Sequence, residues 1–409
     1  MTDVNVIKDA PPAAATRVRV EFIALMALMV SIVAVSTDAM LPALTQIGQD
    51  LGVTQANNNQ LVVTSFFLGL AVGQLFFGPL SDSIGRKSAI NLGFAVFAVG
   101  CVLSLTASDL NMMLAGRVLQ GIGAAGPRTV AVALVRDQYA GRGMARIMSF
   151  VMAVFILVPI AAPALGQGIL LIADWRGIFW MFLGLAVLAT VWLTVRQPET
   201  LPREKRRAFS VVRIGNAVLE VCRSRMAIGS AAAAGLIFSA MIGYLTSSQQ
   251  IFQDAYGVGD LFPLYFAILA IGIGGASIAN ARLVMRLGMQ RLTVWALSAI
   301  IIMAAVFFVI AVSLDGVPPL WSFMLYGVPT FFCMGILFGN LNAMAMEPLG
   351  HIAGVGSAVV ASLTGFISLG LGSAIGLSYN GTVLPLVAGY GVLGGLALLL
   401  MLWVAKGRT

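Results

Sequence analysis

The chain has very little charge for its length. Of its 409 residues, 10% are Asp, Glu, Lys or Arg, whereas 59% are hydrophobic and the mean hydropathy is +0.97. A soluble domain has roughly 25% charged residues. Because so few charges cannot cover a water-facing surface of this size, the composition excludes a soluble enzyme and predicts an integral membrane protein.

Histidine and cysteine are also scarce. The single histidine, His351, cannot supply a His-rich zinc site, and the sequence contains no H-E-x-x-H. The three cysteines (Cys101, Cys222 and Cys333) are far apart and odd in number, so they indicate no disulfide framework. The sequence also lacks G-x-S-x-G and any pair of acids at a catalytic spacing. We therefore expect no enzyme activity, no bound metal and no other cofactor.

The chain is rich in apolar runs of about 20 residues, the length that crosses a bilayer. They fall into two sets of six, one on each side of a polar, basic stretch. This pattern predicts an all-α integral membrane fold, with twelve transmembrane helices in two six-helix pseudo-symmetric bundles. The expected spans are 22–46, 59–80, 88–107, 110–135, 146–171, 175–196, 227–250, 260–282, 290–313, 319–343, 353–377 and 384–405. The expected segments are a tail 1–21, bundles 22–196 and 227–405, a linker 197–226 and a second tail 406–409.

The basic residues lie almost entirely on one side of these spans. If the N-terminus is cytoplasmic, all 24 Lys and Arg residues except Arg117, Arg128 and Arg176 fall in inside segments, while the outside loops carry acids. An excess of positive charge is typical of cytoplasmic loops. We therefore predict that both termini and the linker are cytoplasmic. The basic net charge then reflects membrane topology, and we expect no nucleic-acid partner.

The linker has an apolar pattern of its own. Val211, Ile214, Val218 and Val221 recur at helical spacing among charged residues. A helix lying on the inner membrane surface fits this pattern. A plain solvated linker fits it equally well, and the sequence leaves both readings open.

The stretch between the second and third spans reads GPLSDSIGRK (residues 78–87). Its Gly-Pro pair predicts that the helix ends there, which would place one acid and two bases in a short cytoplasmic turn. As a charge pattern alone it is a simple topogenic loop. As a whole string it resembles the signature loop of the major facilitator superfamily, G-x-L-[AS]-D-[RK]-x-G-[RK]-[RK], with Ser83 where the family usually has a base. A fainter copy, VMRLGMQ (residues 284–290), follows in the second half, as two six-helix repeats predict.

Two more stretches carry the same resemblance. RVLQG (residues 117–121) resembles the R-x-x-Q-G motif of the superfamily. It overlaps a formal G-x-G-x-x-G, but no strand precedes it, so small residues for close helix packing explain it better than a dinucleotide site. VPIAAPALGQG (residues 158–168) resembles a loose form of the motif of the antiporter branch. That resemblance favours export and implies an antiporter-type helix bend at Pro159, Pro163 and Gly166.

With STDAMLP (residues 36–42), the Arg136-Asp137 pair and NAMAMEP (residues 342–348), nearly the whole chain resembles the Bcr/CflA-type drug-resistance subfamily. The resemblance implies a monomeric, proton-coupled exporter of small amphipathic compounds in the bacterial inner (cell) membrane. Its partners would be a small-molecule substrate, protons and the lipid bilayer. An importer or exchanger of a small, possibly anionic, metabolite on the same fold is the alternative. Nothing in the sequence reads as the selectivity filter of a channel.

Three ionisable residues stand out within the expected spans: Asp38, Arg117 and Arg128. Charged groups are costly in hydrocarbon, so each is a functional candidate. Asp38 and Arg117 fall at similar depths and could meet. We expect Asp38 to carry the coupling proton and Arg117 to tune it; a static pair that only holds helices together is the alternative. Arg128 lies three helical turns deeper than Arg117, where it either binds an anionic substrate or reaches toward the inner interface.

Polar residues on several spans complete the expected site. Each is equally well explained as an interhelical hydrogen bond. The candidate substrate-binding residues are Asp38, Arg117, Gln120, Arg128, Gln74, Tyr244, Gln249 and Asn340. For the cytoplasmic loop, the resemblance implies a charge cluster that locks the outward-facing state. The expected members of this lock are Gly78, Asp82, Gly85, Arg86, Lys87, Arg136 and Asp137.

Overall fold

The computed structural model describes residues 20–406, so most of the expected tails 1–21 and 406–409 lies outside the described residues. Twelve long helices dominate it. Those of the first bundle are α1 (Val20–Asp38), α3 (Leu61–Ile84), α4 (Arg86–Leu105), α5 (Leu110–Gln138), α6 (Gly141–Leu170) and α7 (Arg176–Arg196). Those of the second bundle are α9 (Arg225–Gln249), α10 (Phe262–Leu287), α11 (Met289–Val312), α12 (Leu320–Met346), α13 (Ala353–Leu377) and α14 (Leu384–Lys406).

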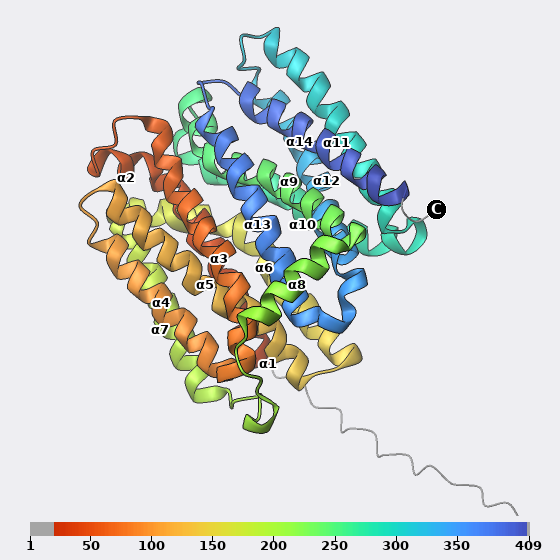
Figure 1. Ribbon diagram of the computed structural model, residues 1–409. Coiled ribbons are helices and arrows are strands. Elements are labelled where there is room, and N and C mark those ends of the chain that lie inside the picture. The colour runs from red at the N-terminus through yellow and green to blue at the C-terminus, as the bar shows by residue number, and fades with distance from the viewer. Residues whose placement is uncertain (1–19, 407–409) are drawn as a thin grey trace, which may run out of the picture.

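Each predicted span coincides with one of these helices. Eleven segments are long and apolar enough to cross a membrane, and one of them, Leu320–Leu377, contains both α12 and α13 joined by the short helix η6 (Glu347–Ile352). Figure 1 shows the helices of the first bundle, red to yellow-green, beside those of the second bundle, green to blue. The prediction of an all-α membrane fold with twelve spanning helices in two bundles is confirmed.

Glycines allow the helices of the first bundle to pack closely. A Cβ on Gly69 of α3 would lie 2.0 Å from the carbonyl oxygen of Val118 on α5, and a Cβ on Gly121 would lie 2.0 Å from that of Phe66. Only glycine permits backbones this close, as in other membrane helix pairs. The Gly121 stretch therefore serves packing, as its place in an apolar helix suggested.

The connection between α3 and α4 corrects one expectation. We predicted that the helix ends at Gly78-Pro79, but α3 continues through both residues to Ile84. Packing explains this, because Gly78 lies against Ala358 of α13, and a proline inside a membrane helix is tolerated where neighbouring helices support it. The turn is a single residue, Gly85, with φ +103° and ψ +156°.

The second half repeats this turn. Gly288 joins α10 to α11 with φ +78° and ψ +155°, close to the backbone conformation of Gly85. Positive φ is accessible to glycine without a steric penalty. The faint sequence repeat therefore corresponds to a repeated one-residue junction at the same place in each bundle.

The first span is interrupted at its acidic residue. Helix α1 ends at Asp38, and the chain continues through η1 (Leu41–Ala43) and α2 (Leu44–Asp50). The ring of a proline clashes with the carbonyl four residues earlier in a helix. For Pro42 that residue is Asp38, so the sequence itself places the break at the carboxyl-bearing position.

The linker contains one helix, α8 (Val211–Arg223), which begins where the Ser210 side chain accepts a hydrogen bond from the backbone N–H of Arg213. Three of its apolar side chains are buried: Ile214, Ala217 and Val221. They pack with residues of α9, α12, η6 and α13. We call the end of the bundles where α3 passes into α4 and the linker begins the linker end.

Candidate functional site

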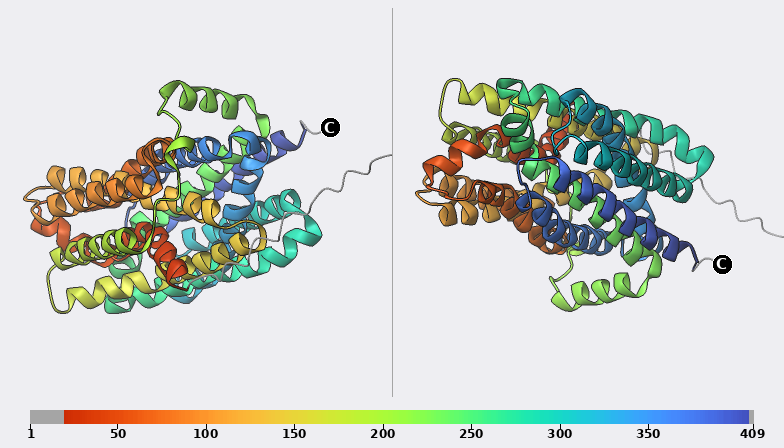
Figure 2. Two further views of the ribbon diagram at one scale, coloured as in Figure 1. Left: turned by 90° about the horizontal axis from the view of Figure 1, so that it is seen from below. Right: turned by 90° about the horizontal axis from the view of Figure 1, so that it is seen from above.

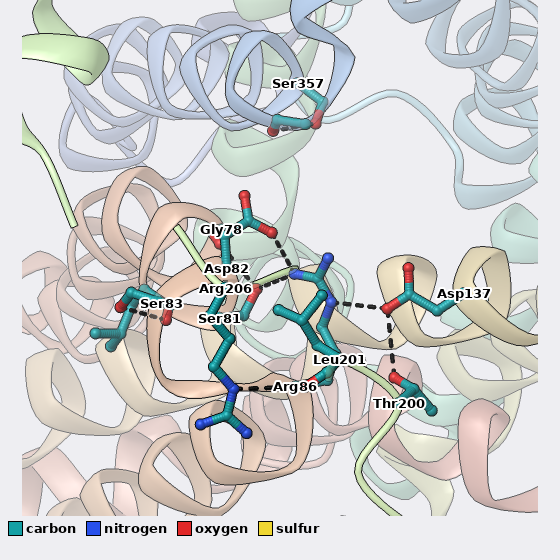
Figure 3. A network of polar contacts seen from close by, with 12 residues as sticks. Gly78, Ser81, Asp82, Ser83, Arg86, Asp137, Thr200, Leu201, Arg206 and Ser357 are labelled. Atoms are coloured by element: carbon teal, nitrogen blue, oxygen red, sulfur yellow. Dashed lines mark hydrogen bonds and ion pairs between the residues drawn. The ribbon is translucent and has the colours of Figure 1, made fainter. Parts of the chain in front are cut away.

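A charge cluster lies at the linker end (Figure 3). Arg86 is its centre and is only 5% exposed. Its guanidinium lies 2.6 Å from Asp82 Oδ1 and 2.9 Å from Asp137 Oδ2, and it donates to Ser81 Oγ at 2.7 Å. Because Asp82 is in the last turn of α3, Arg86 opens α4 and Asp137 is near the end of α5, the cluster ties three helix ends together.

The linker completes this cluster, which sequence reasoning missed. The Glu199 carboxylate accepts hydrogen bonds from the backbone N–H groups of Arg86 (2.9 Å) and Lys87 (3.2 Å). A carboxylate is favoured there because the first N–H groups of a helix have no partner inside it. The Arg207 N–H donates to the Asp82 carbonyl at 2.9 Å, so the linker is bound at two points.

The other expected members of the lock lie around the cluster and not in it. Lys87 Nζ donates to the carbonyl of Thr194 on α7 at 2.8 Å. Arg136 is exposed, and Gly78 faces α13. A Cβ on Gly85 would lie 2.4 Å from Glu199 Oε2, so this glycine also makes room for the docked carboxylate.

Arg117 is fully buried and bonded to the protein. Its guanidinium donates to the carbonyls of Val62 (3.0 Å) and Ser36 (2.9 Å) and to Gln120 Oε1 (2.6 Å). It also lies over the Phe66 ring, 4.7 Å from the centroid. The expected contact with Asp38 is not among these bonds, so in this state Arg117 fixes α1 and α3 against α5 by their backbones.

Asp38 is 4% exposed and lies at the broken end of α1. Its Oδ1 is 3.0 Å from the Thr37 hydroxyl, whose single proton also has the carbonyls of Val33 and Ala34 within reach. Across the interface, the buried Tyr244 hydroxyl of α9 has no hydrogen-bond partner in the described part of the chain and lies within electrostatic range of this carboxyl. The buried Asp38 carboxyl and the buried Tyr244 hydroxyl, which come from opposite bundles, therefore both keep hydrogen-bonding capacity that the described residues do not use.

Helix α6 packs against the chain next to Asp38. It runs unbroken through Pro159 and Pro163, and a Cβ on Gly166 would lie 1.8 Å from the Ala39 carbonyl oxygen. The antiporter-like stretch therefore touches the chain beside Asp38. A bend in α6 at these prolines stays a prediction.

The remaining candidates separate into bonded and unbonded residues. Gln120 also donates to Ser104, Gln249 donates to Thr45 and Gln253, and Asn340 forms a reciprocal pair with Asn280. For Gln249 and Asn340 these bonds fit the alternative of an interhelical hydrogen bond, and a role of any of the three in substrate binding stays a prediction. By contrast, the described residues include no hydrogen-bond or ion-pair partner for buried Gln74 or half-buried Arg128.

A second polar cluster, also missed by sequence reasoning, joins the two bundles at the end opposite the linker. Asn57 Nδ2 donates to the carbonyls of Leu377 and Tyr379, both at 2.9 Å, and Asn57 Oδ1 accepts from Gln250 at 3.0 Å. Gln60 also donates to Gln250, and the Tyr379 hydroxyl donates to the Gln250 carbonyl at 3.1 Å. Burial and the nearby Asp254 carboxylate raise the pKa of Tyr379 to about 12, so this hydroxyl keeps its proton and donates.

Comparison with known proteins places these observations in a family. The sequence model of the Major Facilitator Superfamily matches residues 26–376. The uncharacterised MFS-type transporter YdgK of Bacillus subtilis is 29% identical over 83% of both chains. A bicyclomycin resistance protein homolog of Haemophilus influenzae is 28% identical over 86% of this chain and 87% of the relative, and the multidrug resistance protein MdtL of Escherichia coli is 26% identical over 91% and 92%.

Solved structures show the same fold. The human organic anion transporter MFSD10 (TETRAN) superposes with a TM-score of 0.69 at 16% identity, covering 94% of this chain and 99% of its own. The xylose transporter XylE of E. coli superposes with a TM-score of 0.69 at 14% identity, over 93% and 96% of the two chains.

Proposed function

We propose that this protein exports small amphipathic compounds in exchange for protons. The chain belongs to the Major Facilitator Superfamily, so it is a multi-pass membrane transporter of small molecules and not an enzyme. Its bacterial relatives imply the inner membrane. The excess of Lys and Arg at the linker end supports a cytoplasmic linker and cytoplasmic termini.

Asp38 carries the proposal. Its carboxyl is buried, and it has no basic partner among residues 20–406, because the expected cation, Arg117, is bonded to backbone carbonyls and Gln120. An unpaired buried charge is costly. The carboxyl is therefore best accommodated with a proton while the site is closed, and it can release that proton when the bundles separate and water enters.

Export follows if proton and substrate occupy the interface alternately. In this state the Asn57 and Gln250 contacts join the bundles at the opposite end while the linker-end cluster is also intact, so opening toward the linker end would require that cluster to separate first. Proton release from Asp38 to the cytoplasm and substrate entry would then happen in one state. Separation of the Asn57 cluster would reverse the access and expose Asp38 to protons outside.

Aromatic side chains support an amphipathic substrate class. Phe67 of α3, Phe238 of α9 and Phe338 of α12 form edge-to-face contacts, with ring centroids 6.0 and 5.7 Å apart. They bridge the two bundles, so a planar apolar compound at the interface would meet rings from both. The names of the bicyclomycin and multidrug resistance relatives favour export of such compounds.

The linker-end cluster is the proposed conformational lock. Asp82, Arg86 and Asp137 bind one another and the linker, which itself continues into the second bundle. We propose that binding and release of this cluster accompany the change between inward- and outward-facing states.

Arg128 supports one alternative. A half-buried guanidinium with no hydrogen-bond or ion-pair partner in the part of the chain that the structure describes would suit an anionic compound. Import or exchange of a small anionic metabolite on the same fold therefore stays the second candidate.

Transport in everted vesicles tests the choice. Under the antiport proposal, adding a substrate releases protons from the vesicle lumen, and Asp38→Asn abolishes proton-driven accumulation while the variant still binds neutral substrate. Accumulation against a gradient by Asp38→Asn would place the proton site elsewhere. Proton movement in the same direction as the substrate would favour the second candidate.

A further inference from the structure

The apolar residues of helix α8 form one broad arc around the helix, and the bundle covers only part of it. Ile214, Ala217 and Val221 are buried, and Ala217 and Val221 belong to a cluster with residues of the second bundle. Val211 and Val212 are 67% and 73% exposed. Successive residues of an α-helix are rotated by about 100° around its axis. This spacing places Val211, Val218 and Cys222 on one side of α8, with Val212 and Leu219 beside them. This exposed side, defined by these five residues, is the free face.

The polar residues occupy the opposite side of the helix. By helical spacing, Arg213, Asn216 and Glu220 point away from the middle of the apolar arc, and Arg223 lies at its edge beside Val212. Glu220 contacts His351 of η6 at 2.5 Å, which fixes the rotation of the helix against the bundle. The apolar arc is wider than the contact with the bundle requires, because a surface helix normally has one apolar stripe that its packing covers.

The position of α8 suits a bilayer surface. Figure 2 shows it in light green at the margin of the bundles in both views, outside the packed helices. The Arg225 guanidinium lies over the ring of Trp403, 4.4 Å from the centroid. Tryptophan and arginine gather at the level of the lipid headgroups. This pair is typical of the level where headgroups meet acyl chains, and α8 ends two residues before Arg225.

The charge around α8 is strongly basic. Residues 203–223 contain six basic residues and two acidic ones. Arg203, Lys205, Arg207, Arg213 and Arg223 are exposed, and none has a side-chain hydrogen bond or ion pair among the residues the structure describes. Phosphate headgroups of negative charge attract such clusters of Lys and Arg near the membrane surface.

We propose that α8 is a lipid-binding helix, with its free face among the acyl chains and its basic residues on anionic headgroups of the cytoplasmic leaflet. The occupant is the bilayer and not a protein, because α8 ends beside an Arg-Trp pair typical of headgroup depth and its free face is flanked by cations with no side-chain partner among the described residues. Since the buried face of α8 packs on the second bundle while residues 199–207 bind the first, the lipid would act on the joint between the bundles.

Spin labelling of the full-length protein tests this directly. A nitroxide is attached to Cys222 in a chain carrying Cys101→Ala and Cys333→Ala, and the protein is placed in nanodiscs of phosphatidylcholine and phosphatidylglycerol at 3:1. We expect the label to collide with oxygen several-fold more than with a water-soluble nickel chelate. Asn216→Cys, labelled in a chain that also carries Cys222→Ala, is the matched control on the polar side and should show the reverse preference.

Lipid composition and charge then separate the two parts of the proposal. Pure phosphatidylcholine, or Arg213→Gln with Arg223→Gln, should shift the Cys222 label toward the nickel chelate. Equal nickel access at Cys222 and Asn216→Cys would overturn the proposal. So would a Cys222 label shielded from both reagents, which indicates a protein partner, or immersion that does not change with anionic lipid.

Discussion

Removal of Arg86 should destabilise the first bundle by an amount that the cluster geometry sets. Arg86 is buried and pairs with two carboxylates, at 2.6 and 2.9 Å. Breaking a buried pair by deleting one partner costs about 3–5 kcal/mol. The Asp82 and Asp137 side chains are 32% and 19% exposed, so water recovers part of that, and we expect a loss of about 2–4 kcal/mol for Arg86→Ala.

The reasoning also predicts partial rescue. In Arg86→Ala, two negative side chains remain near each other without a counter-ion, so adding Asp82→Asn should restore roughly 1 kcal/mol. Arg86→Lys should fall between wild type and Arg86→Ala, because an ammonium cannot reach both carboxylates with the fixed fork of a guanidinium. The matched control is Arg136→Ala, an exposed neighbour outside the cluster, which should change stability by less than about 0.5 kcal/mol.

Thermal unfolding of the purified protein, together with transport per folded molecule, measures these effects. The order of midpoints should be wild type, Arg86→Lys, Arg86→Ala with Asp82→Asn, then Arg86→Ala. If the double variant is no more stable than Arg86→Ala, the two aspartates do not interact through the arginine and the account of the cluster is wrong.

Three further predictions concern other parts of the molecule. Gly166→Val should abolish transport, because even a Cβ would lie 1.8 Å from the Ala39 carbonyl oxygen. Gly168→Val should retain transport, because a Cβ there would have nothing within 4 Å. Equal activities of the two variants in a vesicle assay would contradict the close packing. Arg128→Ala should selectively lose anionic compounds in a substrate panel, and a uniform loss across charge classes would instead indicate a structural role. A membrane-impermeant thiol reagent should label Cys222 in inside-out vesicles and not in intact cells, and Asn216→Cys should react faster from the same side; labelling in intact cells would reverse the orientation.

The spanning helices were predictable because the length and hydropathy of a run are local properties. The place where α3 ends was not, since a Gly-Pro pair reads as a helix end and only the packing of Gly78 against α13 shows why the helix continues. The break at Asp38, by contrast, is encoded four residues away in Pro42.

The partners of buried polar residues were harder to predict than their depth. Counting residues along the helices placed Asp38 and Arg117 at similar depths in the bilayer. The direction of a guanidinium, however, depends on the acceptors around it, and Arg117 donates to two backbone carbonyls and to Gln120. Glu199 shows the same limit over a longer range, because nothing local links it to the first turn of α4, more than a hundred residues earlier. A carboxylate close behind Pro198 in a basic segment was the one available hint.

The linker also sets a mechanical stop. Its backbone is bound to the first bundle at Arg207, through the Asp82 carbonyl, and α8 begins at Val211 on the second. Four residue steps can extend to no more than roughly 14 Å. While both attachments hold, this short segment limits how far the two bundles can separate at the linker end. A wider opening requires the Arg207 hydrogen bond to break or α8 to dissociate from the second bundle. Under the proposed function, the length of this segment therefore limits the size of the substrate that can enter, in addition to the chemistry of the interface.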